Sequence, residues 1–347
     1  MTQSVTPHAW EESLCLLSDS VRALLRRDEP LSRHTSLRVG GPAELYLALE
    51  SRDHLAEVAA VAQKHGLPLL LLGDGSNVCV SDAGVRGMVV QNRCRGASIG
   101  PLTLAETGHV FMRLFLKTLQ AGLSGLEFAV GIPGTVGGAL VSNAGAYRAN
   151  ICDLVQQIEV VEAGERQWVG PEWMEFSYRD SRLRRDTRDS AVLLAVTLAL
   201  TPGSKQEIRL KAKDLQMQRI LKQPWEPSAG SFFKNVYDRA LADSLPGLPE
   251  SMRKAGVVPA AYLSEACACK GYRTGAAGIS ARHANFIVNL GGASASDIRA
   301  AAEHMKRRVF EQFGVRLEEE VLYVGEWQAV TPDGPAEGER DGHTTTG

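Results

Sequence analysis

The feature that most constrains this chain is a glycine-rich segment at residues 131–149, which reads GIPGTVGGALVSNAGAYRA. Repeated glycines allow positive φ angles and let a backbone approach a ligand without a Cβ in the way. Their exposed N–H groups can then bind phosphate oxygens. A second cluster at residues 71–77, LLGDGSN, ends an apolar run and offers the same chemistry. Two such clusters in one chain predict a large phosphorylated cofactor that is held at two places.

Neither cluster matches the common nucleotide-binding fingerprints. The chain has no GxxxxGK[ST], and neither stretch is a GxGxxG that enters a helix with an acidic residue about 20 positions later. Glycine accounts for 34 of the 347 residues, which is above the usual ~7%. Ordinary turns therefore remain an open alternative on spacing alone.

Length and charge exclude several classes of protein. A chain of 347 residues suggests two or three domains of roughly 100–200 residues each. The formal net charge of −2 provides no basic field for nucleic acid, and no apolar run approaches the ~18 residues of a membrane span. Residues 1–25 do not resemble a signal peptide, and none of the six cysteines forms CxxC. We expect a cytoplasmic protein with buried thiols and no metal site.

Hydrophobic periodicity predicts helices mixed with short strands. An amphipathic helix at 51–66, capped by Ser51, precedes a buried strand at 68–72 that runs into the first glycine cluster. Further helices are expected at 106–120, at 205–222 and after the capping box at 294–297, and further strands at 85–90, 157–162, 191–200 and 321–324. This mixture favours an α+β fold.

Seven segments, read in order, carry a resemblance to a known family. They are RHTSLRVGGPA (33–43), LGDGSN (72–77), GIPGTVGG (131–138), YRDS (178–181), GSFFKN (230–235), HANFIVN (283–289) and LEEEV (317–321). Together they closely resemble the UDP-N-acetylenolpyruvoylglucosamine reductase (MurB) family, roughly over residues 28–326. The short stretch between Tyr178 and Gly230 resembles the subtype that lacks an inserted substrate-covering loop. The chain departs from the family pattern at Val236, usually a proline, and at Asp74 within the glycine loop.

The resemblance implies a two-part FAD-binding domain of the FAD-linked oxidase type and a smaller α+β substrate-binding domain. It also implies non-covalent FAD, NADPH as the reductant, and reduction of UDP-N-acetylglucosamine enolpyruvate to UDP-N-acetylmuramate in peptidoglycan precursor synthesis. We expect an N-terminal extension at 1–27, the FAD-binding domain at 28–204 with a division near residue 91, the substrate-binding domain at 205–327, and a disordered tail at 328–347. No nucleic acid, membrane or obligatory oligomer is expected as a partner.

Three residues match the catalytic positions of the family. The resemblance implies that Arg179 binds the substrate carboxylate through its planar guanidinium. It implies that Glu320, with a pKa raised by burial, is protonated and donates a hydrogen bond to the developing enolate. It also implies that Ser231 supplies the proton. From the residues alone, Arg179 could form a surface ion pair with Asp180 or Asp186. Glu320 could equally belong to a solvated acidic run, and Ser231 could be a turn serine.

The other expected site residues bind cofactor or substrate. FAD is expected on the backbones of the two glycine clusters, at Gly73, Asp74, Gly75, Ser76, Asn77, Gly131, Ile132, Pro133, Gly134, Gly137 and Gly138. The expected substrate contacts are Tyr147, Lys222, Lys234, Asn235 and His283, with Lys222 suited to a diphosphate. A lone histidine such as His283 is more often structural.

Two alternatives from other classes remain open. Another FAD-linked sugar or alcohol oxidase would usually carry a covalent-flavin His or Cys near the first loop, and Ser76-Asn77-Val78 has no such His. A non-enzymatic flavin- or nucleotide-binding module would not need the combination of Arg179, Ser231 and Glu320.

Overall fold

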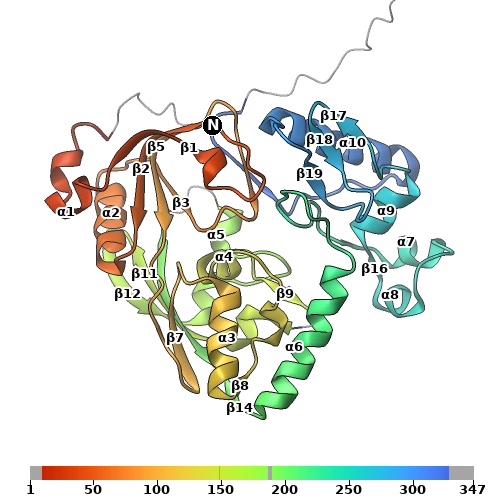
Figure 1. The fold of residues 1–347 in the computed structure, drawn as a ribbon, viewed down its shortest axis with the longest axis horizontal. Coiled ribbons are helices and arrows are strands. Elements are labelled where there is room, and N and C mark those ends of the chain that lie inside the picture. The colour runs from red at the N-terminus through yellow and green to blue at the C-terminus, as the bar shows by residue number, and fades with distance from the viewer. Residues whose placement is uncertain (1–9, 148, 187–189, 328–347) are drawn as a thin grey trace, which may run out of the picture.

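The N-terminal part of the chain forms a four-stranded sheet with a helix packed against it (Figure 1). The computed structural model describes residues 10–147, 149–186 and 190–327. In the strand order β1-β2-β5-β3, β5 runs parallel to β2 and β3, whereas β1 is antiparallel to β2. The elements are β1 (Arg26–Pro30), β2 (Pro42–Leu49), α2 (Arg52–Lys64), β3 (Leu69–Leu72) and β5 (Val85–Asn92).

The local predictions for this unit are confirmed in most respects. Ser51 caps α2 by accepting a hydrogen bond from the His54 N–H at 3.4 Å, and the buried residues of the helix are the predicted Leu55, Val58, Ala59 and Ala62. The strand predicted at 68–72 is β3, but only Leu72 is buried in it, because β3 lies at the edge of the sheet.

The residues that precede β1 also belong to this unit. Trp10 is buried, and its indole N–H donates to the Pro68 carbonyl at 2.8 Å. Leu17 and Val21, from the short helical region around η1 (Leu14–Leu16) and α1 (Asp19–Arg22), lie in the same core. The described part of the expected extension therefore packs on the sheet, and residues 1–9 lie outside the described residues.

The second unit is a five-stranded antiparallel sheet in the order β12-β11-β13-β7-β6. The strands predicted at 157–162 and 191–200 are confirmed as β11 and β13. The helix predicted at 106–120 is α3, which begins only at Phe111, because Glu106 still belongs to β7 and pairs with Ala195. The elements are β6 (Ala97–Ser98), β7 (Leu102–Glu106), α3 (Phe111–Ala121), α4 (Val136–Val141), β11 (Val155–Glu162), β12 (Glu165–Val169) and β13 (Val192–Ala199).

Helix α6 (Lys205–Ile220) packs beside α3, as Figure 1 shows, and belongs to the core of the second unit. Its buried residues Ile208, Ala212 and Leu215 join the same cluster as Phe111 and Leu198. Helix α6 therefore packs with the second unit, although the substrate-binding domain is expected to begin at residue 205. The TPGS segment at 201–204 is a local signal, whereas the core that α6 joins is set by contacts with residues far away in the chain.

The C-terminal unit packs a three-stranded antiparallel sheet against the long helix α10. The predicted capping box is present, since Ser294 and Asp297 each accept a hydrogen bond from the other's backbone N–H. The elements are β15 (Val236–Tyr237), α7 (Arg239–Ser244), α8 (Glu250–Ala255), β16 (Val257–Val258), α9 (Ala260–Ala266), β17 (Arg273–Thr274), β18 (Ala277–Ile279), β19 (Ile287–Asn289) and α10 (Ala295–Phe313).

The end of the described chain returns to the first glycine cluster. The strand predicted at 321–324 is β20 (Leu322–Val324), and it pairs in parallel with β4 (Val78–Val80), which directly follows that cluster. Glu320 is thereby brought next to Asn77. The tail expected to be disordered, 328–347, lies outside the described residues.

The remaining elements are short. They are η2 (Leu31–Arg33), β8 (Leu123–Ser124), η3 (Glu127–Ala129), β9 (Gly145–Ala146), β10 (Ala149–Asn150), η4 (Ile151–Leu154), η5 (Pro171–Met174), α5 (Arg182–Arg185) and β14 (Thr201–Pro202).

Of the thiols expected to be buried, Cys15 is exposed and Cys152 half-buried. Across the described ranges, no helix is long and apolar enough to cross a membrane, and no group of three or more His, Cys, Asp or Glu residues could hold a metal ion.

Candidate active site

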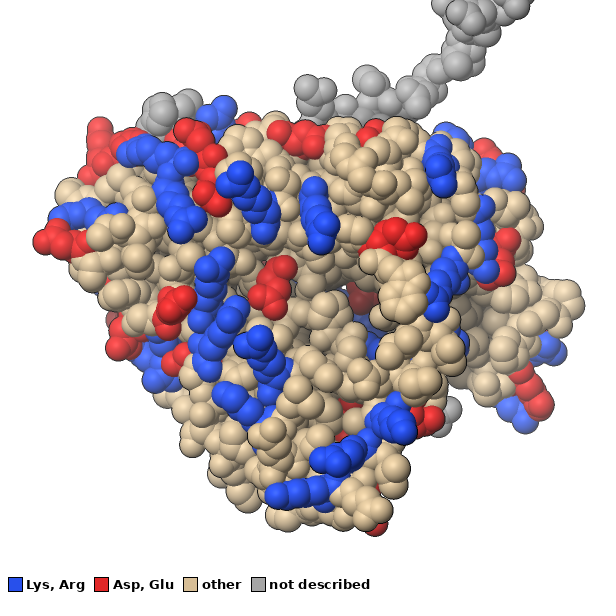
Figure 2. Space-filling view, in the orientation of Figure 1, with Lys and Arg blue, Asp and Glu red and all other residues tan. Residues whose placement is uncertain are grey.

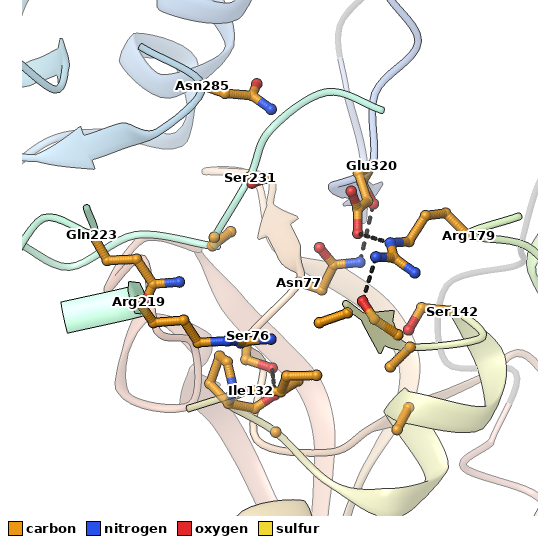
Figure 3. Close-up of a pocket in the computed structure, with 18 of the residues that line it drawn as sticks. Ser76, Asn77, Ile132, Ser142, Arg179, Arg219, Gln223, Ser231, Asn285 and Glu320 are labelled. Carbon is orange, nitrogen blue, oxygen red and sulfur yellow. Dashed lines mark hydrogen bonds and ion pairs between the residues drawn. The ribbon is translucent and has the colours of Figure 1, made fainter. Parts of the chain in front are cut away.

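A cavity of about 430 Å³ opens where the two glycine clusters, the C-terminal end of α6 and the C-terminal unit meet (Figure 3). Figure 2 shows a hollow in the middle of the molecular face, between the lobes seen in Figure 1. Thirteen of the residues singled out from the sequence line this cavity: Ser76, Asn77, Ile132, Pro133, Gly134, Gly138, Tyr147, Arg179, Lys222, Ser231, Asn235, His283 and Glu320. Segments far apart in the sequence therefore share one site.

The other expected site residues do not line the cavity. They are Gly73, Asp74, Gly75, Gly131, Gly137 and Lys234. Two of these glycines shape the first loop instead: a Cβ on Gly73 would lie 2.5 Å from Thr135 Oγ1, and a Cβ on Gly75 would lie 2.1 Å from the His34 carbonyl oxygen. The ammonium of Lys234 lies 2.5 Å from Glu318 Oε1, so the expected substrate contact of Lys234 is not supported by its position.

The two glycine clusters pack against each other and leave backbone donors free. Gly134 has φ +105°, and a Cβ there would lie 2.5 Å from Ser76 Oγ, which donates to the Pro133 carbonyl at 3.4 Å. Among the hydrogen bonds of the described residues, none uses the backbone N–H of Gly75, Ser76, Asn77 or Gly134. Free amides at the meeting of two loops suit phosphate oxygens, so these residues fit the pyrophosphate of FAD.

Glu320 and Arg179 point toward each other at one side of the cavity (Figure 3). Glu320 Oε1 lies 3.5 Å from Arg179 Nε, and the two side chains are 22% and 19% exposed. The other guanidinium nitrogens of Arg179 donate to the carbonyls of Asn143, at 3.4 Å, and Gly145. Asp180, one of the two expected surface partners, instead pairs with Arg185 at 3.2 Å. Arg179 is thus held in the cavity by backbone carbonyls and by Glu320.

Burial raises the pKa values of Glu320 and of the neighbouring Tyr178. It raises the pKa of Glu320 above its ordinary value, although the positive charges of Arg179, Arg184 and Lys234 oppose the shift. Burial also raises the pKa of the Tyr178 phenol to about 12. The direction for Glu320 agrees with the expectation of a carboxyl group that can donate a hydrogen bond.

The three consecutive glutamates occupy different environments. Glu318 is 71% exposed and pairs with Lys234, whereas Glu319 points to Lys306, with 3.0 Å between Oε1 and Nζ. Only Glu320 lines the cavity. The interpretation of this run as a uniform solvated surface is therefore wrong.

Ser231 directly precedes Phe232 and Phe233, whose backbones are hydrogen-bonded to Asn285 and to Glu320. Asn285 accepts from the Phe232 and Phe233 N–H groups, through its carbonyl at 2.8 Å and its side chain at 3.0 Å. The Phe232 carbonyl in turn accepts from the Glu320 N–H at 2.8 Å. Among the described residues, no hydrogen bond engages the Ser231 hydroxyl, which is therefore available to a ligand.

The expected substrate contacts surround this centre. Tyr147 is 45% exposed, and its hydroxyl donates to the Leu215 carbonyl at 3.3 Å. Asn235 accepts from the Ala260 N–H at 3.3 Å. Burial and the charge of Lys222 lower the pKa of His283, so the neutral imidazole is favoured near pH 7.

Sequence reasoning missed several residues that build the site. Asn285 lies within the HANFIVN segment, so the motif itself could have indicated it. Arg219 lines the cavity, with its guanidinium carbon 5.8 Å from the centre of the Tyr147 ring. Arg184 is buried and donates to the Glu320 carbonyl at 2.8 Å. No sequence signal distinguishes Arg184 from the neighbouring arginines of α5.

Comparisons with known proteins agree with this architecture. A family model for the C-terminal domain of UDP-N-acetylenolpyruvoylglucosamine reductase matches residues 222–324, and a model for an FAD-binding domain matches residues 43–169. The first match begins just after α6, where the packing also changes from one core to the next.

Curated relatives and a solved structure extend the match over most of the chain. The UDP-N-acetylenolpyruvoylglucosamine reductase of Rubrobacter xylanophilus is 38% identical over 302 residues, which cover 86% of this chain and 95% of that protein. The Moorella thermoacetica reductase is 39% identical over 314 residues, covering 89% and 96%. The crystal structure of the Thermus caldophilus reductase has a TM-score of 0.69 at 32% identity and covers 86% of this chain and 99% of its own.

Proposed function

This chain belongs to the UDP-N-acetylenolpyruvoylglucosamine reductase family, and from that premise we propose that the cavity lined by Arg179, Ser231 and Glu320 is its catalytic centre. The protein is an FAD-dependent oxidoreductase that uses NADPH to reduce UDP-N-acetylglucosamine enolpyruvate to UDP-N-acetylmuramate in peptidoglycan precursor synthesis. The observation that supports the proposal is the convergence of these three side chains, from three distant segments, on one cavity.

The glycine clusters are proposed to hold the cofactor. FAD, when bound, transfers hydride from NADPH to the vinyl group of the substrate. The free amides of Gly75, Ser76, Asn77 and Gly134 would bind its pyrophosphate, which is a non-covalent attachment. Because Gly134 and Ser76 are in close contact, both clusters must keep their backbone paths for the cradle to exist.

Arg179 and Glu320 are proposed to bind and polarise the enolpyruvyl carboxylate. A guanidinium offers a planar fork to a carboxylate, and a protonated Glu320 can donate a further hydrogen bond to an oxygen that gains negative charge. Their separation of 3.5 Å lets both groups approach one carboxylate. Donors already aimed at the developing charge stabilise the transition state more than the ground state.

Ser231 is proposed to deliver the proton that completes the reduction. Hydride addition to one vinyl carbon leaves a carbanion on the other, and this carbanion is basic enough to take a proton from a hydroxyl group. The Ser231 hydroxyl makes no hydrogen bond among the described residues and borders the cavity. The fastening of Phe232 by Asn285 and Glu320 fixes the position of the serine relative to the acid.

The UDP part is proposed to lie against Tyr147, Lys222, Asn235 and His283. Lys222 presents a compact charge suited to the diphosphate, and His283, with its lowered pKa, would contribute a neutral hydrogen-bonding group. On this view the part from residue 28 to the end of α6 holds FAD, and the substrate lies between Tyr147 and Arg179 of that part and the residues that follow α6. Dependence on NADPH favours a cytoplasmic location, where the product would serve cell-wall growth, cell shape and division.

A two-stage anaerobic experiment tests the proposed function. NADPH should bleach the flavin absorbance of the purified protein, and the enolpyruvyl sugar should restore it within a single turnover. A flavin that NADPH reduces but the enolpyruvyl sugar does not reoxidise would reject this substrate and point to another FAD-linked oxidoreductase.

A further inference from the structure

The backbone of Glu320 is held by two donors that come from the cofactor-binding part of the chain. Its carbonyl oxygen accepts from Asn77 Nδ2 at 3.0 Å and from Arg184 Nη2 at 2.8 Å. Asn77 ends the first glycine cluster, and Arg184 lies on α5. Neither donor contacts the carboxyl group, whose partner is Arg179.

We infer that Arg184 is a positioning residue for Glu320: it fixes the backbone of the acid so that the carboxyl group meets Arg179 and the substrate. The inference rests on the proposed role of Glu320. Arg184 does not line the cavity, so it acts through Glu320 rather than on the substrate.

The environment of Arg184 is unusual for a purely structural arginine. Its side chain is only 6% exposed, and its nearest carboxylate, Asp180 Oδ1, lies 4.0 Å from Nε. Nη2 also reaches the Glu319 carbonyl at 3.3 Å, whereas Nη1 is buried without a hydrogen-bond partner among the described residues. Burying a charge without full pairing costs free energy.

The placement of Arg184 in the sequence strengthens the argument. It lies five residues after Arg179, and Ser181 Oγ, between them, donates to the Val141 carbonyl at 2.7 Å. One anchored segment therefore carries both Arg179, which contacts the Glu320 carboxyl group, and Arg184, which donates to the Glu320 carbonyl. With Arg184 removed, that carbonyl would keep only the bond from Asn77, and the contact of 3.5 Å with Arg179 would loosen.

The charge of Arg184 also affects the pKa of Glu320. Arg179, Arg184 and Lys234 favour its ionised form, and Tyr178 stays a neutral phenol because its pKa is about 12. Loss of the Arg184 charge should raise the pKa of Glu320 further. The rate of flavin reoxidation by the enolpyruvyl sugar should then begin to fall at a higher pH than in the wild type. Loss of packing alone would not produce this shift.

The test compares Arg184→Met, Arg184→Lys and the matched control Arg185→Met. Arg185 lies on the same helix, is 39% exposed, and donates to Glu175, Ser177 and Asp180. Stopped-flow absorbance measures flavin reduction by NADPH and reoxidation by the enolpyruvyl sugar across pH. We expect Arg184→Met to slow reoxidation roughly 10- to 100-fold, as for a misplaced reacting group, with nearly normal reduction. Arg184→Lys should recover part of the rate, and Arg185→Met should behave as the wild type.

A double-variant cycle with Glu320→Ala separates the possible outcomes, because alanine leaves no side chain at position 320 to be positioned. If Arg184 acts through Glu320, the Arg184→Met/Glu320→Ala protein should be no slower than the slower single variant. Multiplicative defects, an unchanged pH profile, or equal losses in both half-reactions would overturn the inference. If Arg184→Met does not fold with FAD, Arg184→Gln, which also removes the charge, carries the same pH and cycle test. Failure of the wild type to reduce the enolpyruvyl sugar would instead reject the proposed function.

Discussion

At the scale of single residues, the proposed site depends on a carboxyl group whose pKa is raised by burial although cations surround it. Desolvation raises the pKa of Glu320, and Arg179 and Arg184 reduce that shift without reversing it. The motifs predicted Arg179, Ser231 and Glu320 from the sequence, because their segments match a family pattern. Arg184 and Asn285 were not predicted, since both act through backbone carbonyl and amide groups of residues remote in sequence.

Substitutions in the acidic run should separate Glu320 from Glu319. We expect Glu320→Gln to keep partial activity, because a neutral amide still donates a hydrogen bond. Glu320→Ala should slow reoxidation by roughly 10²–10³-fold, as is typical for loss of a donor to a developing anion. Glu319→Ala should change the rate little, since Glu319 pairs with Lys306 outside the cavity. Single-turnover reoxidation measures all three, and comparable defects in the two alanine variants would contradict the assignment.

The pH dependence should report the protonation of Glu320. Its pKa is raised in the folded protein, and the protonated form is the proposed donor. The reoxidation rate should therefore be highest below this pKa and fall as the pH rises through it. Glu320→Gln should lose this limb, because an amide does not titrate. An identical alkaline limb in the glutamine variant would assign the titration to another group.

Ser231→Ala should separate the two half-reactions. Only reoxidation by the enolpyruvyl sugar needs a proton directed at carbon, so flavin reduction by NADPH should be almost intact. General acid catalysis is typically worth 10²–10⁴-fold, and we expect a loss of about that size in reoxidation alone. Rapid-mixing traces for each step provide the measurement. Equal losses in both steps would point to a general binding or folding role for the serine.

At the scale of elements, local sequence signals predicted which residues form helices and strands better than they predicted what those elements pack against. The cap and stripe of α2 and the capping box of α10 depend on neighbouring residues, and both helices are confirmed. The start of α3 and the core that α6 joins depend on contacts with Ala195 and Phe111, far away in the chain. Periodicity defines an apolar face but not the surface that covers it.

The contact between the two glycine clusters makes an element-scale prediction about cofactor binding. Gly134→Ala should greatly reduce FAD binding, because its Cβ would lie 2.5 Å from Ser76 Oγ at φ +105°. Gly66→Ala is the matched control, with φ +61° and open space around the added carbon. It should lower the free energy of unfolding by about 1 kcal/mol without weakening FAD binding. Flavin content after purification and fluorescence titration of FAD measure both variants, and equal flavin contents would contradict the cradle.

At the scale of the whole molecule, the last described strand ties the acid to the cofactor loop. β20 pairs with β4, so Asn77 and Glu320 lie next to each other although 243 positions separate them. The second cluster comes from the other sheet unit, through α4. A cofactor held by both clusters would therefore connect the first sheet, the second sheet and the segment that carries the acid.

Binding of FAD should accordingly stabilise the whole fold rather than one loop. A ligand that binds only the native state adds about 2.7 kcal/mol at a free concentration of 100 Kd, and Tm should rise with the logarithm of FAD concentration. The rise should vanish in Gly134→Ala and persist in Gly66→Ala. Because the cradle consists of backbone amides, acid precipitation should release the flavin into solution. Colour that stays on the precipitated protein would show a covalent bond and contradict the assignment of FAD to these amides.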